Sequence, residues 1–209
     1  MNKRSFLSGI VIGAGAVISL IALFIYFLPE LYLYSENRNF KNIRKKSELD
    51  CNAMPLHCLV EEGEPDDINN YIQRGGSLEL KDNWGQSALL WALRNNKGSS
   101  VPILLHAGAN PNTKDENGIS ILYQAIVWEN YDIADSLLQN GADINLLSGN
   151  EYPETPLHFC VMRNRLDCVQ YLLGKGANKY LQDSFGYTVF DRLKTHKRIS
   201  KEIGEVLKK

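Results

Sequence analysis

The sequence lacks the short motifs in which catalytic and metal-binding residues are usually arranged. Its 209 residues include only four histidines and four cysteines, and none of them forms an H-E-x-x-H or a C-x-x-C pattern. A G-x-S-x-G motif and a phosphate-binding glycine loop are also absent. We therefore expect a non-enzymatic protein that uses no cofactor and no metal.

Clusters of basic residues are missing from the main part of the chain. Residues 51–209 carry sixteen Lys or Arg against twenty Asp or Glu, and the net charge of the whole chain is -1. Binding to a phosphate backbone depends on clustered cations, so nucleic acid is not an expected partner. The 44% of apolar and 22% of charged residues are typical of a folded globular protein.

Charge is absent from one long stretch near the amino terminus. Residues 6–28 read FLSGIVIGAGAVISLIALFIYFL, and about twenty apolar residues are enough for a helix to cross a bilayer. A cleavable secretory signal has a shorter apolar region, of roughly 7 to 15 residues. We expect an uncleaved transmembrane signal anchor at 6–28, behind a cytoplasmic amino terminus at 1–5.

The flanking charges give two opposing indications of orientation. Lys3 and Arg4 stand directly before the apolar stretch, which favours an amino terminus in the cytoplasm and an exported body. A basic linker follows at 29–50, and its cations favour the reverse orientation or contact with anionic headgroups. We expect a single-pass protein of a bacterial inner membrane with its body in the periplasm, and keep the cytoplasm-facing alternative open.

The rest of the chain is built on a period of about 33 residues. One glycine ladder runs through Gly75, Gly108, Gly141 and Gly176, and a second through Gly85, Gly118 and Gly186. Both ladders contain 33-residue steps and the same two-residue insertion, which is the signature of a repeat architecture. We divide the chain into four repeats at 51–185 and a capping repeat at 186–209.

Each repeat predicts two helices and a hairpin. The first helix begins at M-P-L-H (54–57) or T-P-L-H (155–158), where proline suits the first helical turn. The second helix carries apolar residues at helical spacing, such as Val101, Leu104 and Leu105. A glycine follows that helix in a position suited to left-handed backbone, and the Asp/Asn-rich segment after it suits a turn.

The T-P-L-H start and closing segments such as NGADIN at 140–145 resemble the ankyrin repeat. The resemblance implies an all-α repeat solenoid, placed here behind the single transmembrane helix. It also implies that His57 and His158 are structural residues whose rings bind neighbouring backbone. In ankyrin proteins, partners usually meet the hairpin tips and the exposed positions of each first helix.

Those positions define a candidate partner-binding set that is rich in aromatic residues and arginine, the types that dominate interface hot spots. Trp84, Tyr152 and Phe185 recur at hairpin tips and are either partner anchors or packing residues against the next hairpin. A two-residue insertion within 146–152 lengthens one hairpin and is typical of a binding face. The set comprises Trp84, Gln86, Arg94, Asn95, Asn117, Ile119, Val127, Trp128, Tyr152, Glu154, Met162, Arg163, Phe185 and Tyr187.

The four cysteines form two pairs. Cys51 and Cys58 could form a disulfide across the turn into the first helix, but would lie about 10 Å apart if one helix held both. Both alternatives stand. Cys160 and Cys168 fall at buried helix positions, where we expect free cysteines that act as small apolar side chains.

A small body of this kind behind one membrane span resembles bacterial membrane-anchored ankyrin-repeat immunity proteins, which neutralise type VI secretion lipase effectors. The resemblance implies that the partner is another protein, a secreted phospholipase toxin. Two alternatives remain: a periplasmic stress-protection scaffold, and a cytoplasm-facing membrane adaptor or transporter subunit.

Overall fold

The computed structural model describes residues 50–62, 64–196 and 198–209, which belong to one compact unit of the chain, Arg44–Lys209. The expected anchor at 6–28, the segment at 1–5 and all of the linker except Asp50 lie outside the described residues. Among the helices that are described, none is both long and apolar enough to cross a bilayer.

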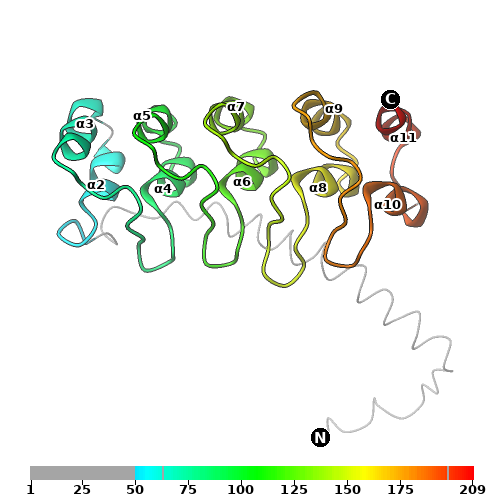
Figure 1. Cartoon of the computed structure of the whole chain (residues 1–209), viewed down its shortest axis with the longest axis horizontal. Coiled ribbons are helices and arrows are strands. Elements are labelled where there is room, and N and C mark those ends of the chain that lie inside the picture. The colour runs from blue at the N-terminus through cyan, green and yellow to red at the C-terminus, as the bar shows by residue number, and fades with distance from the viewer. Residues whose placement is uncertain (1–49, 63, 197) are drawn as a thin grey trace, which may run out of the picture. The chain divides into compact units, whose positions relative to one another are not determined.

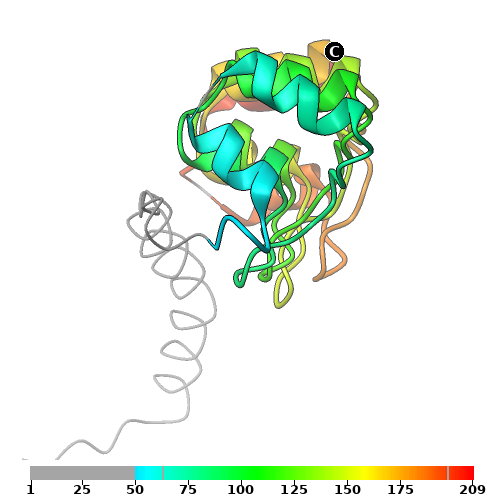
Figure 2. The same ribbon diagram turned by 90° about the vertical axis from the view of Figure 1, so that its left-hand side faces the viewer.

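Within the described ranges, ten helices form five consecutive pairs and the only β-structure is a set of isolated bridges. The first helices of the pairs stand in one row and the second helices in another (Figure 1), and the two rows are seen end on in Figure 2. The pairs are α2 (Pro55–Glu62) with α3 (Pro65–Gln73), α4 (Ala88–Arg94) with α5 (Ser100–His106), α6 (Ile121–Val127) with α7 (Tyr131–Gln139), α8 (Pro156–Met162) with α9 (Leu166–Gly174), and α10 (Val189–Thr195) with α11 (Lys201–Lys208).

A hydroxyl residue starts four of the five first helices. The side chains of Ser87, Ser120, Thr155 and Thr188 each accept a hydrogen bond from the backbone N–H three residues later. Such caps satisfy an N–H group that has no partner inside the helix and contribute about 1 kcal/mol each. In α2 the corresponding residue is Met54, which has no hydroxyl to offer.

Glycines end the second helices because the backbone there turns left-handed. Gly108 has φ +94°, and Ala109 after it donates its N–H to Leu104 O at 3.0 Å. Gly141 repeats the arrangement with φ +89°. A side chain would strain this conformation, which explains the first glycine ladder of the sequence.

The core lies between the two rows of helices. Six consecutive residues of α4, of α6 and of α8 are buried, because each of these helices packs between two neighbouring first helices and against its own second helix. The second helices bury only one face, as the apolar spacing predicts.

Hairpin fingers project from the row of first helices, and we number them by the pair that they precede (Figure 1). In fingers 2, 3 and 5, an aspartate carboxylate at the finger base accepts hydrogen bonds from two backbone N–H groups of the tip. Finger 4 instead closes with a backbone pair between Ser148 and Glu154, and the two inserted residues lengthen its tip. The fingers are finger 2 (82–86), finger 3 (115–119), finger 4 (148–154) and finger 5 (183–187).

Neighbouring fingers are tied together by hydrogen bonds. Gly149 donates its N–H to Gly118 O at 3.0 Å, and Ser184 donates to Pro153 O at 2.9 Å. Closer to the helices, the Asn112 side chain accepts from Asp143 N at 2.7 Å. Fingers 3, 4 and 5 therefore form one connected row.

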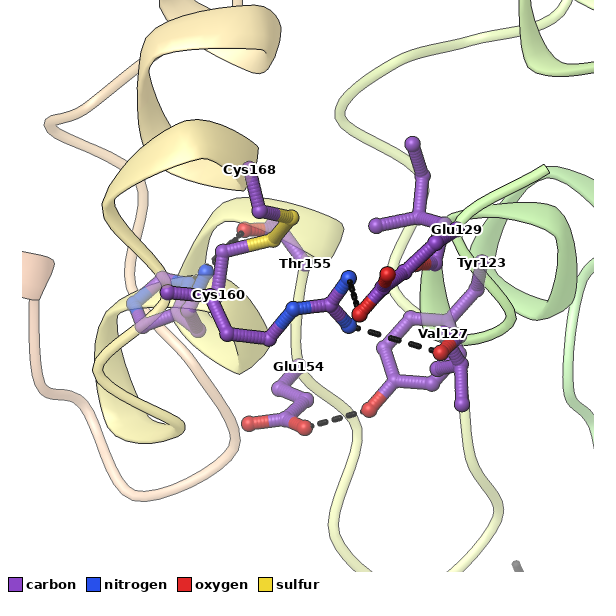
Figure 3. The surroundings of a disulfide bond; sticks show 10 residues. Tyr123, Val127, Glu129, Glu154, Thr155, Cys160 and Cys168 are labelled. Carbon is purple, nitrogen blue, oxygen red and sulfur yellow. Dashed lines mark hydrogen bonds and ion pairs between the residues drawn. A yellow bond between two sulfur atoms is a disulfide. The ribbon is translucent and has the colours of Figure 1, made fainter. Parts of the chain in front are cut away.

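The structure contains two disulfides in its described part. Cys51 lies in the turn before α2 and Cys58 within α2, so the single-helix alternative does not apply, and their Cα atoms are 5.7 Å apart. Cys160 on α8 is bridged to Cys168 on α9 (Figure 3). Our expectation that Cys160 and Cys168 are free was wrong, because the antiparallel packing of α8 on α9 also brings their Cα atoms to 5.7 Å.

Candidate functional site

The structure separates the candidate partner-binding set by exposure. The exposed members are Asn117, Tyr152, Phe185 and Tyr187, and the half-buried members are Trp84, Arg94, Val127, Trp128, Glu154, Met162 and Arg163. Gln86, Asn95 and Ile119 are buried, so their assignment to exposed positions was wrong.

These three buried residues serve the fold. Gln86 and Ile119 stand at the bases of fingers 2 and 3, immediately before the helix-capping serines, where their backbone groups pair with the aspartate at the other side of the finger. Asn95 lies at the end of α4, and its side-chain amide donates to Trp91 O at 3.1 Å. The same carbonyl also accepts the Asn95 backbone N–H at 2.9 Å, so the side chain adds a second hydrogen bond at the helix end.

Arg94 connects a first helix to the next finger. Its guanidinium lies 2.6 Å from the carboxylate of Asp115 and donates to Gln124 Oε1 at 2.9 Å. The Asp115 side chain is almost fully buried and also holds the tip of finger 3. Since a buried carboxylate needs a cation partner, this contact with Asp115 is structural.

The two repeat histidines join each first helix to the following finger. His57 Nε2 lies 2.9 Å from Gln86 O, and His158 Nε2 lies 2.9 Å from Tyr187 O. Burial lowers the pKa of both rings, which favours neutral imidazoles that donate one N–H to these carbonyls. His158 Nδ1 also bonds the Thr155 hydroxyl at 2.8 Å, whereas His57 follows Met54 and its buried Nδ1 has no hydrogen-bond partner among the described residues.

Exposed aromatic side chains gather on fingers 4 and 5. The Tyr152 and Phe185 rings are stacked, with centroids 5.4 Å apart and an interplanar angle of 9°. Tyr152 is 52% exposed, Phe185 46% and Tyr187 39%. Packing on the neighbouring finger and presentation to solvent thus occur together, and we call Tyr152, Phe185 and Tyr187 the aromatic platform.

Arg192 of α10 supports the aromatic platform. Its guanidinium carbon lies 5.4 Å from the Phe185 ring centroid and 4.8 Å from that of Tyr187. An ion pair with the buried carboxylate of Asp183 fixes it there, and its Nε donates to Asp183 at 2.8 Å. The sequence did not lead us to Arg192. Its only signal is that Arg192 follows Asp183 by nine residues, the same spacing by which Gln124 follows Asp115.

A carboxyl group stands at the base of finger 4. The Tyr123 hydroxyl, from α6, donates to Glu154 Oε1 at 2.5 Å (Figure 3). Burial raises the pKa of Glu154 to about 7, although the bond from Tyr123 and the charges of Arg163 and Arg192 act in the opposite direction. Glu154 is therefore divided between its protonated and ionised forms near neutral pH.

Arg163 ends α8 close to this carboxyl group. Its guanidinium lies over the Phe159 ring, 5.7 Å from the centroid, and among the described residues it has no hydrogen bond or ion pair. Arg165 lies over the same ring at 5.9 Å but is paired with Glu129 at 2.7 Å. Of these two arginines, only Arg163 leaves its donors available to a partner.

Comparison with known proteins gives two family matches. A model described as "Ankyrin repeat" matches residues 84–116, and one described as "Ankyrin repeats (many copies)" matches residues 122–173. The chain contains ankyrin repeats. The pairs α2–α3 and α10–α11 lie outside the matched ranges but pack on the adjoining ankyrin pairs in the same row.

Curated relatives share the ankyrin region. The chain is 32% identical over 128 residues to "Putative ankyrin repeat-containing protein" of Treponema pallidum (strain Nichols), covering 61% of this chain and 42% of the relative. It is 31% identical over 124 residues to the human "SH3 and multiple ankyrin repeat domains protein 2", with 59% and 7% covered. The human "Transient receptor potential cation channel subfamily A member 1" is 30% identical over 154 residues, with 70% and 14% covered. The chain thus spans less than half the length of these relatives.

Ankyrin repeats generally act as non-enzymatic scaffolds that bind other proteins. In the described ranges, no three His, Cys, Asp or Glu side chains come together in a way that could hold a metal ion. The surface features of this ankyrin stack are the aromatic platform, Glu154 and the unpaired guanidinium of Arg163.

Proposed function

We propose that this ankyrin stack binds a protein partner through fingers 4 and 5 and the end of α8, and that it acts as an immunity protein that neutralises a secreted phospholipase toxin. The aromatic platform is the observation that supports this surface. Half-exposed aromatic side chains bury large area with few rotatable bonds, and such residues contribute most of the free energy of binding at interfaces.

The fixed geometry of the surface also favours binding. Hydrogen bonds connect fingers 3, 4 and 5, and the ion pair with Asp183 holds Arg192 beneath the rings. A surface that is already ordered loses little conformational entropy when it meets a partner, so more of the contact energy appears as affinity.

Location at the bacterial inner membrane is part of the proposal. The uncharged stretch at 6–28 and the cations Lys3 and Arg4 before it favour an anchored, exported body. Disulfides at Cys51–Cys58 and Cys160–Cys168 suit an oxidising compartment such as the periplasm. An inhibitor anchored there would meet a phospholipase at its lipid substrate.

The test is protection of cells from a periplasm-targeted lipase encoded next to this protein. Co-production of the full chain should restore growth, and Tyr152→Ala with Phe185→Ala should abolish protection at unchanged protein level. Tyr180→Ala is the matched control, because this exposed tyrosine lies beside α9 and α11 and outside the aromatic platform.

Two results would favour the alternatives. Protection from peroxide without any effect on the lipase would favour a stress-protection scaffold. An ankyrin stack on the cytoplasmic side of the membrane would favour a membrane adaptor and would contradict the proposed immunity function.

A further inference from the structure

We propose that the surface formed by Arg163 and the aromatic platform recognises a protein segment that presents a carboxylate beside an aromatic or large apolar side chain. This inference rests on the proposed protein-binding function and specifies the chemistry of the partner. Arg163 binds the carboxylate, and the stacked rings of Tyr152 and Phe185 receive the neighbouring side chain.

The first argument is the contrast between Arg163 and the other arginines of this region. Arg94, Arg165 and Arg192 each form an ion pair, with Asp115, Glu129 and Asp183 respectively. The guanidinium of Arg163 has no such partner among the described residues.

A planar guanidinium with free N–H donors matches a carboxylate in a two-bond arrangement. The Phe159 ring lies 5.7 Å from the guanidinium carbon of Arg163, and this cation–π contact holds the half-buried guanidinium at the end of α8. An ion pair formed there is stronger than one between two fully exposed side chains.

The second argument is that Glu154, whose carboxyl group feels the charge of Arg163, has its hydrogen bond with another residue. Glu154 instead accepts a hydrogen bond from Tyr123, and burial raises its pKa to about 7. The charged groups that act on Glu154 are Arg163, Arg192 and Asp183. Protonation of Glu154 removes a negative charge that competes with a partner carboxylate for Arg163.

Partner binding and protonation of Glu154 are therefore coupled. A carboxylate placed on Arg163 adds negative charge near Glu154 and favours its neutral form. By linkage, the partner binds more tightly when Glu154 is already protonated. Affinity should fall as the pH rises from about 6 to about 8, with the change centred near the pKa of Glu154.

The third argument is the continuity between Arg163 and the aromatic platform. Tyr152 lies on the same finger as Glu154, two residues earlier, and its ring is stacked on Phe185. Arg192 both supports Phe185 and acts on the Glu154 carboxyl group. A segment bound to Arg163 thus has an apolar surface within reach, and an Asp or Glu next to Trp, Tyr or Phe fits both parts.

The experiment selects peptides on the full-length protein in detergent micelles. A phage-displayed library of random 12-residue peptides is selected on the wild type at about pH 6. We expect selected peptides to pair an acidic residue with an aromatic one. Their affinity should fall at least about tenfold with Arg163→Gln, be partly kept by Arg163→Lys, and be unchanged by Arg74→Gln, an exposed arginine after α3.

The pH dependence supplies a second measurement. Wild-type affinity for a selected peptide should be several-fold lower at about pH 8 than at about pH 6, and Glu154→Gln should bind equally well at both. Melting curves of Arg163→Gln should be close to those of the wild type, because the substitution breaks no hydrogen bond or ion pair of this guanidinium among the described residues.

Three outcomes would overturn the inference. These are selected peptides without acidic residues, peptides whose binding survives Arg163→Gln, and no selected peptides at all. If peptides without acidic residues are lost with Tyr152→Ala, the aromatic platform still binds protein, so the proposed function stands while the carboxylate preference is wrong.

Discussion

One position of the repeat gives side chains with very different surroundings along the stack. The residue before the helix cap is Gln86, Ile119, Glu154 or Tyr187, and exposure rises from the first two through Glu154 to Tyr187. Fingers 3 and 4 follow finger 2 in the row, and finger 5 is the last finger of the described residues (Figure 1). Exposure of this side chain thus rises toward the end of the described row, where the proposed binding surface lies.

Truncation of the aromatic platform should separate binding from folding. Tyr152→Ala or Phe185→Ala should weaken capture of the protein partner by at least about 2 kcal/mol, roughly thirtyfold in affinity, because half-exposed aromatic anchors have this effect at interfaces. The melting temperature should change little. Binding to the purified partner and melting curves are measured in parallel, with Tyr180→Ala as control. Early melting together with normal binding would show that these rings are packing residues.

Glu154 should make stability depend on pH. Its pKa rises from an ordinary value of 4.5 to about 7 in the folded protein. Between these values the folded state holds a proton that the unfolded chain has released, so the free energy of unfolding falls as the pH rises from about 4.5 to about 7. A rise from 4.5 to about 7 corresponds to about 3 kcal/mol, because one pKa unit equals about 1.4 kcal/mol.

Urea unfolding from pH 4.5 to 8 measures this effect, and Glu154→Gln provides the comparison. The lowered pKa values of His57 and His158 act with the opposite sign, since the unfolded chain then binds the extra protons. The wild type and Glu154→Gln both keep these histidines, so the difference between their pH profiles isolates the contribution of the Glu154 carboxyl group. Parallel pH profiles would contradict the assignment.

At the scale of elements, arginine–aspartate pairs attach helices to fingers. Arg94 joins α4 to finger 3, and Arg192 joins α10 to finger 5. Each aspartate holds the backbone of its finger tip at the same time. Each ion pair therefore fixes the position of a finger relative to the first helix that carries the arginine.

Loss of the Arg94 pair should destabilise the fold. Arg94→Met leaves the buried carboxylate of Asp115 without its cation, which costs roughly 3 kcal/mol when one partner of a buried pair is removed. Chemical denaturation measures the change, and Arg163→Met is the matched control with little expected effect. Addition of Asp115→Asn should recover part of the loss, because the amide oxygen still accepts from the finger tip. Equal stability of the two arginine variants would contradict the structural role of Arg94.

The disulfides predict the thiol content of the protein. Unfolded protein prepared under oxidising conditions should contain no free thiols, since both cysteine pairs are bridged. The Cys51–Cys58 bridge closes only a short loop, so its removal should lower stability by about 2 kcal/mol or less. Thiol counting in denaturant is the measurement. Two free thiols would mean that Cys160 and Cys168 are packing residues after all.

At the scale of the whole chain, the 33-residue period predicted the repeats because it reflects backbone requirements. Gly108 must turn left-handed and Thr155 must cap a helix, and both needs are local. The burial of Gln86 and the bridge between Cys160 and Cys168 depend on which elements pack together. The contact between Tyr123 and Glu154 joins residues 31 positions apart, so local pattern did not indicate it.

The topology proposal belongs to the same scale. An alkaline phosphatase reporter fused after Lys209 should be active, because Lys3 and Arg4 favour retention of the amino terminus in the cytoplasm. A reporter that works only in the cytoplasm, fused at the same residue, should be silent. The reverse result would place the ankyrin stack on the cytoplasmic side and contradict export.

The longer tip of finger 4 has a consequence for how such a protein diversifies. Its two additional residues lie beyond the backbone pair of Ser148 and Glu154, and α8 after them keeps the capping and packing of the other first helices. Insertions at a finger tip thus leave the register of the helices intact. Length and sequence at this tip can therefore change in evolution while the helices keep their packing, and the same tip is a suitable place to insert residues that bind a new partner.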